Sequence, residues 1–144
     1  MRKVFSDTLY WVATIKPNDS YQRPAREARH MFGPCLLVTT DEVLHEFVTA
    51  FAKSGPTLRE KAVRIVKELI DSASVKVIAQ SRVSFLQAME RFSQRLDKEY
   101  SLTDCSSMNV MDAEGIEDIL TNDHHFRQEG YNVLINRSES RHAR

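Results

Sequence analysis

The chain has 144 residues, which suits a single domain able to bury roughly two thirds of its unfolded surface around one core. Apolar residues make up 42% and charged residues 28%, a balance typical of folded globular proteins, which excludes a disordered chain. The 20 basic and 20 acidic residues cancel. Overall charge therefore cannot hold a nucleic acid, and such a partner requires a local basic surface or bound cations.

Cysteine content and hydropathy indicate in which cellular compartment the protein is expected. Cys35 and Cys105 have neither the number nor the spacing of a disulfide framework or a zinc site, so reduced thiols are expected. We recognise no leader peptide, and no run approaches about eighteen apolar residues, so no membrane contact is expected. These patterns predict a cytoplasmic protein with one domain over residues 1–136 and a polar C-terminal tail over residues 137–144.

Short β-rich runs alternate with segments of helical period along the chain. The runs predict five strands, at residues 2–6, 36–40, 75–79, 117–121 and 131–135. Apolar residues at helical spacing predict helices between strands, at Val43 to Phe51, Leu58 to Leu69 and Phe85 to Leu96. Pro24 and Pro56 suit first helical turns, and Gly33 and Gly115 suit breaks between elements. Strands separated by helices indicate an α/β sandwich with a mainly parallel five-stranded sheet.

Four carboxylates lie near the carboxyl ends of these strands, where open parallel sheets bind ligands. Asp7 follows the first strand and Asp123 follows the fourth, whereas Glu46 and Asp104 lie in the helices after the second and third strands. Capping of the next helix is the more frequent role of an Asp after a strand. Ser101 and Asp104 also fit a Ser-x-x-Asp variant of the capping box. Capping and ligand binding both stay open for the three Asp residues.

Glu46 is harder to explain as a solvated surface residue. Its helical neighbours include Val43 and Phe47, so the carboxylate borders an apolar face and is costly to desolvate unless it is paired or binds a metal. No lysine or arginine lies within four residues of it in the sequence. Its partner is therefore expected from a distant part of the chain.

Carboxylates gathered at one edge of a sheet repel each other and retain protons unless a cation neutralises them. Mg²⁺ or Mn²⁺ prefers oxygen ligands and keeps several waters, which suits three or four carboxylates. Such ions generate a hydroxide nucleophile and stabilise the oxygens of a phosphodiester during in-line attack. The acids therefore indicate metal-dependent phosphodiester hydrolysis.

Four segments carry a resemblance to a known family: "VFSDTLYW", "TTDEVLHEF", "DKEYSLTDCSS" and "ILTNDHHF". In this order and at these separations they resemble the PIN-domain ribonucleases, which include VapC-type toxins of toxin–antitoxin pairs. The resemblance implies a small three-layer α/β/α PIN-like domain over almost the whole chain. It implies catalytic, metal-binding acids at Asp7, Glu46, Asp104 and Asp123, with Thr8, Asp97 and Thr121 as accessory residues.

Other side chains give weaker signals. His124 and His125 are adjacent and are expected to point to different faces, which argues against one shared metal. Basic residues that recur at helical spacing suit solvated helix faces as well as RNA contacts, so none is assigned: Arg91, Arg95 and Lys98, and Arg23, Arg26, Arg29 and His30. Arg127 is the basic residue nearest in sequence to Asp123. Apolar residues such as Tyr10, Trp11 or Phe51 are candidates for a homodimer patch.

The leading hypothesis is an endoribonuclease that depends on Mg²⁺ or Mn²⁺, cleaves single-stranded RNA and is the toxin of a pair neutralised by a small antitoxin. One alternative is a non-catalytic PIN-like module that binds RNA or a protein. Another is a stand-alone RNA-processing nuclease. Other folds with acids at strand ends fit less well, because "DTLYW" lacks the second Asp of a haloacid-dehalogenase-type phosphatase and "YNVLINR" lacks the lysine of a phosphoaspartate receiver.

Overall fold

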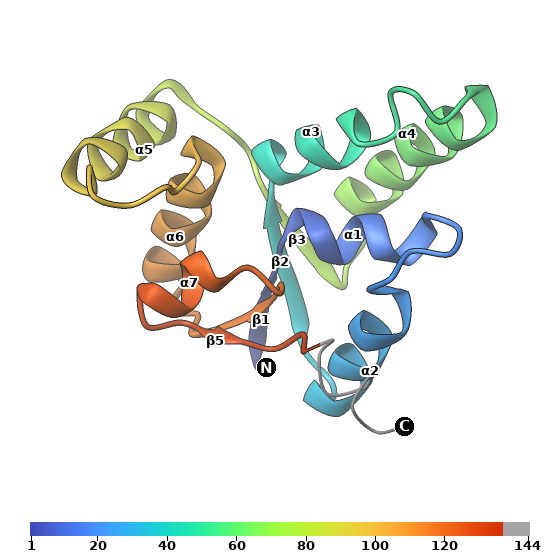
Figure 1. Cartoon of the computed structure of the whole chain (residues 1–144), viewed down its shortest axis with the longest axis horizontal. Coiled ribbons are helices and arrows are strands. Elements are labelled where there is room, and N and C mark those ends of the chain that lie inside the picture. The colour runs from blue at the N-terminus through green and yellow to red at the C-terminus, as the bar shows by residue number, and fades with distance from the viewer. Residues whose placement is uncertain (137–144) are drawn as a thin grey trace.

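The computed structural model describes residues 1–136, so the tail predicted over residues 137–144 lies outside the described part. The first half contains β1 (Lys3–Ser6), α1 (Thr8–Ile15), α2 (Gln22–Phe32), β2 (Leu36–Thr40), α3 (Asp41–Thr49) and α4 (Pro56–Asp71). The second half contains β3 (Val75–Ile78), α5 (Arg82–Gln94), α6 (Leu102–Glu114), β4 (Asp118–Leu120), α7 (His124–Gln128) and β5 (Asn132–Val133). Figure 1 shows these elements as helices around a central twisted sheet.

The sheet has the strand order β3-β2-β1-β4-β5, and every neighbouring pair is parallel. Phe5 of β1 lies opposite Val38 on one side and Ile119 on the other. All five predicted strands are present, which confirms the α/β class with a parallel sheet. β5 is shorter than predicted, although the backbone amides of Leu134 and Ile135 still donate to carbonyls at the end of β4.

Two layers of helices cover the sheet. Helices α1 to α4 connect β1 to β2 and β2 to β3, and they lie on one side of the sheet, whereas α5, α6 and α7 lie on the other (Figure 1). From β1 the chain passes through β2 to β3 at one edge of the sheet, and it then crosses back to β4 and on to β5 at the other edge. Because crossovers between parallel strands are right-handed, the helices of these two halves lie on opposite faces of the sheet. The core between the layers includes Phe5, Phe47, Met108 and Ile119, all fully buried.

The order of the strands creates a switch point between β1 and β4. The chain leaves β1 toward one layer of helices and leaves β4 toward the other, so a crevice opens beyond the carboxyl ends of these two strands. Asp7 directly follows β1, and Asp123 lies three residues beyond Leu120 at the end of β4. The topology thus brings together two acids that lie far apart in the sequence.

The residues named as candidates for a dimer patch are not on the surface. Tyr10, Trp11 and Phe51 are only 8%, 5% and 1% exposed, because α1 and the turn after α3 pack into the core. The largest group of exposed apolar side chains lies on α5 instead, in a row that we call the α5 stripe: Val83, Leu86, Met89, Phe92 and Leu96, the last just beyond the helix. The helix was predicted correctly, but its apolar face meets solvent.

Within residues 1–136, no helix combines the length and the apolar character that crossing a membrane requires.

Candidate active site

Asp7 occupies the start of α1 without capping it. Its backbone is the N-cap of α1, yet its carboxylate makes no side-chain cap hydrogen bond. Thr121 Oγ1 donates to Asp7 Oδ2 at 2.8 Å across the switch point. The capping role open to Asp7 is therefore wrong, and the side chain turns instead toward the end of β4.

Burial raises the pKa of Asp7 to about 7, although the Thr121 hydroxyl opposes the shift. The negative charges of Asp104 and Glu46 add to the rise in the Asp7 pKa. A carboxylate in this environment is ionised at neutral pH only at a cost, and a nearby cation would remove that cost.

Glu46 has the distant partner that its apolar surroundings required. Thr8 Oγ1 donates to Glu46 Oε1 at 2.8 Å, and the two residues are 38 apart in the sequence. Thr8 begins α1 and Glu46 lies on α3, so one hydrogen bond joins these two helices beside Asp7. The expectation of a partner from elsewhere in the fold is confirmed.

Asp104 has the capping role left open for it, and its carboxylate also contacts a histidine. Its carboxylate accepts from Ser101 N at 3.1 Å while Ser101 Oγ accepts from Asp104 N at 2.9 Å, which completes the predicted capping box of α6. The same carboxylate lies 3.2 Å from His125 Nδ1. Burial raises the pKa of Asp104, and the charge of Asp123 adds to the rise.

Asp123 caps α7, because its Oδ1 accepts from the backbone N–H of His125 at 2.9 Å. Its own N–H donates to Thr121 Oγ1 at 3.2 Å. Thr121 thus contacts both Asp7 and Asp123, and Thr8 contacts Glu46. The hydroxyls of the two predicted accessory threonines hydrogen bond to members of the predicted acid set.

One pocket gathers the four predicted acids. Asp7, Glu46, Asp104 and Asp123 all line it, together with Thr8, Leu9, Tyr21, Glu99, Ser101, Thr121, Asn122 and His125. Among the described residues, no lysine or arginine belongs to this lining. The pocket therefore concentrates negative charge without a cationic side chain to balance it.

Some residues fall differently from the sequence expectation. Asp97 does not line the pocket; its side chain is 77% exposed and lies 3.6 Å from Lys98. Glu99, two residues later, does line it. Sequence reasoning also missed Tyr21 and Asn122, which are joined by a hydrogen bond of 3.0 Å, because neither belongs to a motif of known chemistry.

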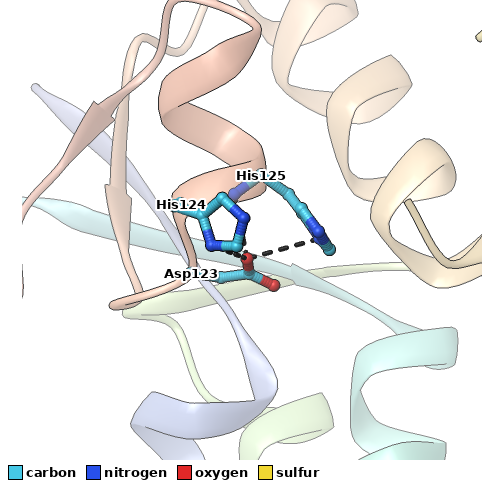
Figure 2. Close-up of side chains that lie close together, drawn as sticks. All are labelled: Asp123, His124 and His125. Carbon is cyan, nitrogen blue, oxygen red and sulfur yellow. Dashed lines mark hydrogen bonds and ion pairs between the residues drawn. The ribbon is translucent and has the colours of Figure 1, made fainter. Parts of the chain in front are cut away.

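The histidines lie closer together than the sequence suggested. Within the described part of the chain, one group of three acidic, histidine or cysteine side chains offers possible ligand atoms all within 4.8 Å of one another: Asp123, His124 and His125. Figure 2 shows both imidazole rings beside the Asp123 carboxylate. The expected divergence of the two rings is wrong, because they stand in the first turn of α7 with their centroids 4.6 Å apart.

The predicted basic helix face forms internal ion pairs. Arg91 contacts Asp112 at 2.6 Å and Glu129 at 3.3 Å, and Arg95 contacts Glu129 at 3.1 Å. These contacts join α5 to α6 and to the residues after α7, so they support a structural role for both arginines. Arg127 is exposed and does not line the acidic pocket.

The residues of the pocket fit a divalent cation. Several carboxylate oxygens from four separate elements converge there, hydroxyl groups orient two of the acids, and burial disfavours the charge of Asp7 and Asp104. Hard divalent ions prefer this set of donors.

The architecture defines a class of fold. A parallel five-stranded sheet between two layers of helices, with acids at its switch point, is the PIN-like fold that the four sequence segments implied. No protein-family model matches the chain, and no curated protein matches it at a significant level of sequence similarity.

A solved structure does match. The chain is similar to VapC20 of Mycobacterium tuberculosis, a toxin that cleaves the sarcin–ricin loop, with a TM-score of 0.79 over 92% of this chain and 99% of that one. The two sequences are 23% identical over this match, so the likeness establishes the shared fold. The predicted α/β/α PIN-like fold is confirmed.

Proposed function

We propose that this protein is a metal-dependent endoribonuclease that hydrolyses phosphodiester bonds of single-stranded RNA. The observation that carries the proposal is the convergence of Asp7, Glu46, Asp104 and Asp123 on one pocket whose lining, within the described part of the chain, contains no lysine or arginine. A stable fold tolerates such a concentration of acids most readily when the acids have a ligand of opposite charge. The fold shared with VapC20, a toxin that cleaves RNA in the sarcin–ricin loop, adds support.

In this proposal the four acids hold Mg²⁺ or Mn²⁺. The bound ion would supply a hydroxide nucleophile and stabilise negative charge on the phosphate. Thr121 fixes one oxygen of Asp7, and Thr8 fixes one oxygen of Glu46, so the remaining oxygens keep defined directions. Ser101 orients Asp104 in the same way from the start of α6. These contacts pre-arrange the ligands before the ion arrives.

RNA cleavage is the test of this function. Purified protein with Mn²⁺ is expected to cleave a labelled single-stranded RNA, and EDTA is expected to stop the reaction. Asp104→Asn is expected to remove activity because it deletes a negative charge from the site. A non-catalytic binding module would bind the RNA without cleaving it, with or without Mn²⁺, and that result would contradict the proposal.

We infer further that the nuclease is a toxin that acts on RNA in the cytoplasm and is neutralised by a small antitoxin. The fold shared with a toxin supports this reading. Induced expression in a bacterial host should then arrest growth, and the Asp104→Asn variant should not. A short neighbouring gene for a small DNA-binding protein should relieve the arrest. Growth without arrest, together with RNA cleavage in vitro, would favour a stand-alone RNA-processing nuclease.

We propose that the protein is a homodimer formed through the α5 stripe. Its residues are 46% to 81% exposed, a large apolar surface for one helix. They are spaced almost symmetrically about Met89, so two copies of α5 crossing antiparallel at a twofold axis would match apolar side chains along the contact. Arg82 at one end would then approach Asp97 of the partner subunit at the other.

A further inference from the structure

Two imidazole rings stand at the edge of the acidic pocket, where an all-carboxylate site would have none. Asp123 Oδ1 lies 3.9 Å from His124 Nδ1 and 3.4 Å from His125 Nδ1 (Figure 2). One possible ligand atom from each of the three residues falls within 4.8 Å of the other two. The group therefore offers nitrogen and oxygen donors together.

A second contact comes from another element and extends this arrangement. His125 Nδ1 is also 3.2 Å from Asp104 Oδ2 on α6, a residue 21 positions away in the sequence. Neighbouring ligand atoms around one ion with bonds of about 2.1 Å lie about 3.0 Å apart in an octahedron and about 3.4 Å apart in a tetrahedron. The separations of His125 Nδ1 from the two carboxylates, 3.2 and 3.4 Å, match this range.

The His125 ring is held in place without a metal. Its side chain is only 19% exposed, and its backbone N–H is fixed by the Asp123 carboxylate. Tyr100 packs edge to face against the ring at 5.3 Å, and the Tyr100 hydroxyl donates to Glu129 at 2.8 Å. The ring thus needs little rearrangement to direct a nitrogen toward an ion between Asp104 and Asp123. His124, whose side chain is 67% exposed, is the more exposed donor.

We propose that Asp123, His124 and His125 form a mixed nitrogen and oxygen binding site for a transition-metal ion, with Asp104 as a neighbouring ligand. Imidazole is a favourable ligand for transition metals and a poor one for Mg²⁺. The site therefore selects Mn²⁺ over Mg²⁺, and it takes Zn²⁺ as a competing ion. This inference refines the proposed metal site and rests on that proposal, but it does not require that RNA is the substrate.

Pulsed electron paramagnetic resonance of Mn²⁺ bound to the full chain tests the site directly. We expect modulation from a ¹⁴N nucleus on the bound Mn²⁺, and we expect it to change when the histidines alone are labelled with ¹⁵N. This measurement uses the unaltered protein, so it does not depend on the folding of a variant. Mn²⁺ bound without nitrogen coupling would overturn the inference and leave the carboxylate site intact.

Variants supply the selectivity test. Replacing both histidines by alanine is expected to lower the preference for Mn²⁺ over Mg²⁺ by about tenfold, measured as the ratio of the two dissociation constants by calorimetry. His30→Ala is the matched control, because His30 is an exposed histidine on α2 and does not line the pocket. An unchanged ratio in the double variant would overturn the inference. Nitrogen coupling in a protein that cleaves no RNA would instead uphold it and overturn the proposed function.

Discussion

Two carboxylates that are shielded from solvent, Glu129 and Asp7, differ in the donors around them. Glu129 is surrounded by donors: Arg91 and Arg95 pair with it, and the Tyr100 hydroxyl donates to it. Burial by itself raises the pKa of Glu129, but the hydrogen bonds from Arg95 and Tyr100 outweigh it and leave the pKa lowered. Asp7 has one hydroxyl donor and two acidic neighbours, and its pKa is raised to about 7.

Glu129 therefore has the surroundings of a structural carboxylate, whereas Asp7 has those of a carboxylate that binds a ligand. Glu129 is compensated by the chain itself, so it joins α5 to the residues after α7. No lysine or arginine in the described lining of the pocket compensates Asp7, so a bound cation would favour its ionised form. Opposite mutational effects should follow from the same chemical change, carboxylate to amide.

The largest effect is expected for Asp7→Asn. This variant should reduce metal-dependent RNA cleavage by more than about 100-fold, because it removes a buried charged ligand. In EDTA at neutral pH it should also stabilise the fold, on the order of 1–3 kcal/mol, because the amide avoids the cost of a buried charge. Urea unfolding and a cleavage assay measure the two effects. A variant that is both active and less stable would contradict this account of Asp7.

Glu129→Gln should show the opposite sign. Loss of the charge leaves Arg91 and Arg95 without their shared carboxylate, and we expect a loss of about 1–2 kcal/mol in unfolding free energy. Mn²⁺ affinity should change little, since Glu129 does not line the acidic pocket. Urea unfolding and Mn²⁺ calorimetry check both statements. A large loss of Mn²⁺ affinity with unchanged stability would reverse the roles assigned to the two groups.

The raised pKa of Asp7 should also make the stability of the fold depend on pH. The pKa of Asp7 is about 7 in the folded protein and near 3.8 when unfolded, so the folded state binds the proton more tightly. The Asp7 contribution to stability is therefore full below about pH 4 and is lost as the pH rises through about 7. Urea unfolding in EDTA across this range should show the decline, and Asp7→Asn should make it smaller, leaving the part that comes from Asp104, whose pKa is also raised by burial. Saturating Mn²⁺ should also flatten it, and a decline of unchanged size in Asp7→Asn would assign the effect to another group.

The α5 stripe gives a prediction that does not depend on the acids. Leu86→Glu places a charge in the middle of the proposed dimer contact and should convert a dimer into a monomer, measured by analytical ultracentrifugation. Gln87→Glu is the matched control, because Gln87 is the exposed neighbour outside the stripe. A wild-type protein that is monomeric at all concentrations would contradict the proposed interface.

The smallest effect is expected for Thr121→Val. The hydroxyl donates to Asp7 and accepts from the backbone N–H of Asp123, so its removal costs about 1 kcal/mol of stability or of metal binding. Mn²⁺ calorimetry and urea unfolding together measure that total. Thr103→Val, a threonine on α6 that does not line the acidic pocket, should leave Mn²⁺ affinity unchanged.

The strands and the parallel sheet were predictable from sequence because short β-branched runs alternate with longer helical periods. The four acids were also identifiable, since each lies at or shortly beyond a strand end and the topology then brings them together. Their capping roles were separable only in the structure: the Asp123 and Asp104 side chains make the hydrogen bonds of a helix cap, whereas the Asp7 side chain makes no cap hydrogen bond. The Asp7 carboxylate accepts from Thr121, which follows β4 and is 114 residues away in the sequence, so the local sequence around Asp7 does not reveal this contact.

Features that depend on packing direction were not predictable. The apolar period of α5 is the same whether the stripe faces the core or solvent, so the sequence did not reveal that this face is exposed. For the same reason Tyr10, Trp11 and Phe51 were candidates for a dimer patch, although the structure buries them. The histidine geometry also depends on how α7 is capped, because Asp123 turns back to His125 and brings both rings toward its carboxylate. Sequence adjacency alone favours divergent side chains.

Calorimetric titration of Mn²⁺ into the wild-type protein and into Asp7→Asn tests the central claim most directly, that uncompensated acids at the switch point hold a divalent ion. We expect saturable binding to the wild type and at least about tenfold weaker binding to Asp7→Asn, a variant that should be folded and more stable in EDTA. No Mn²⁺ binding to the wild type, or equal affinity in the two proteins, would contradict it.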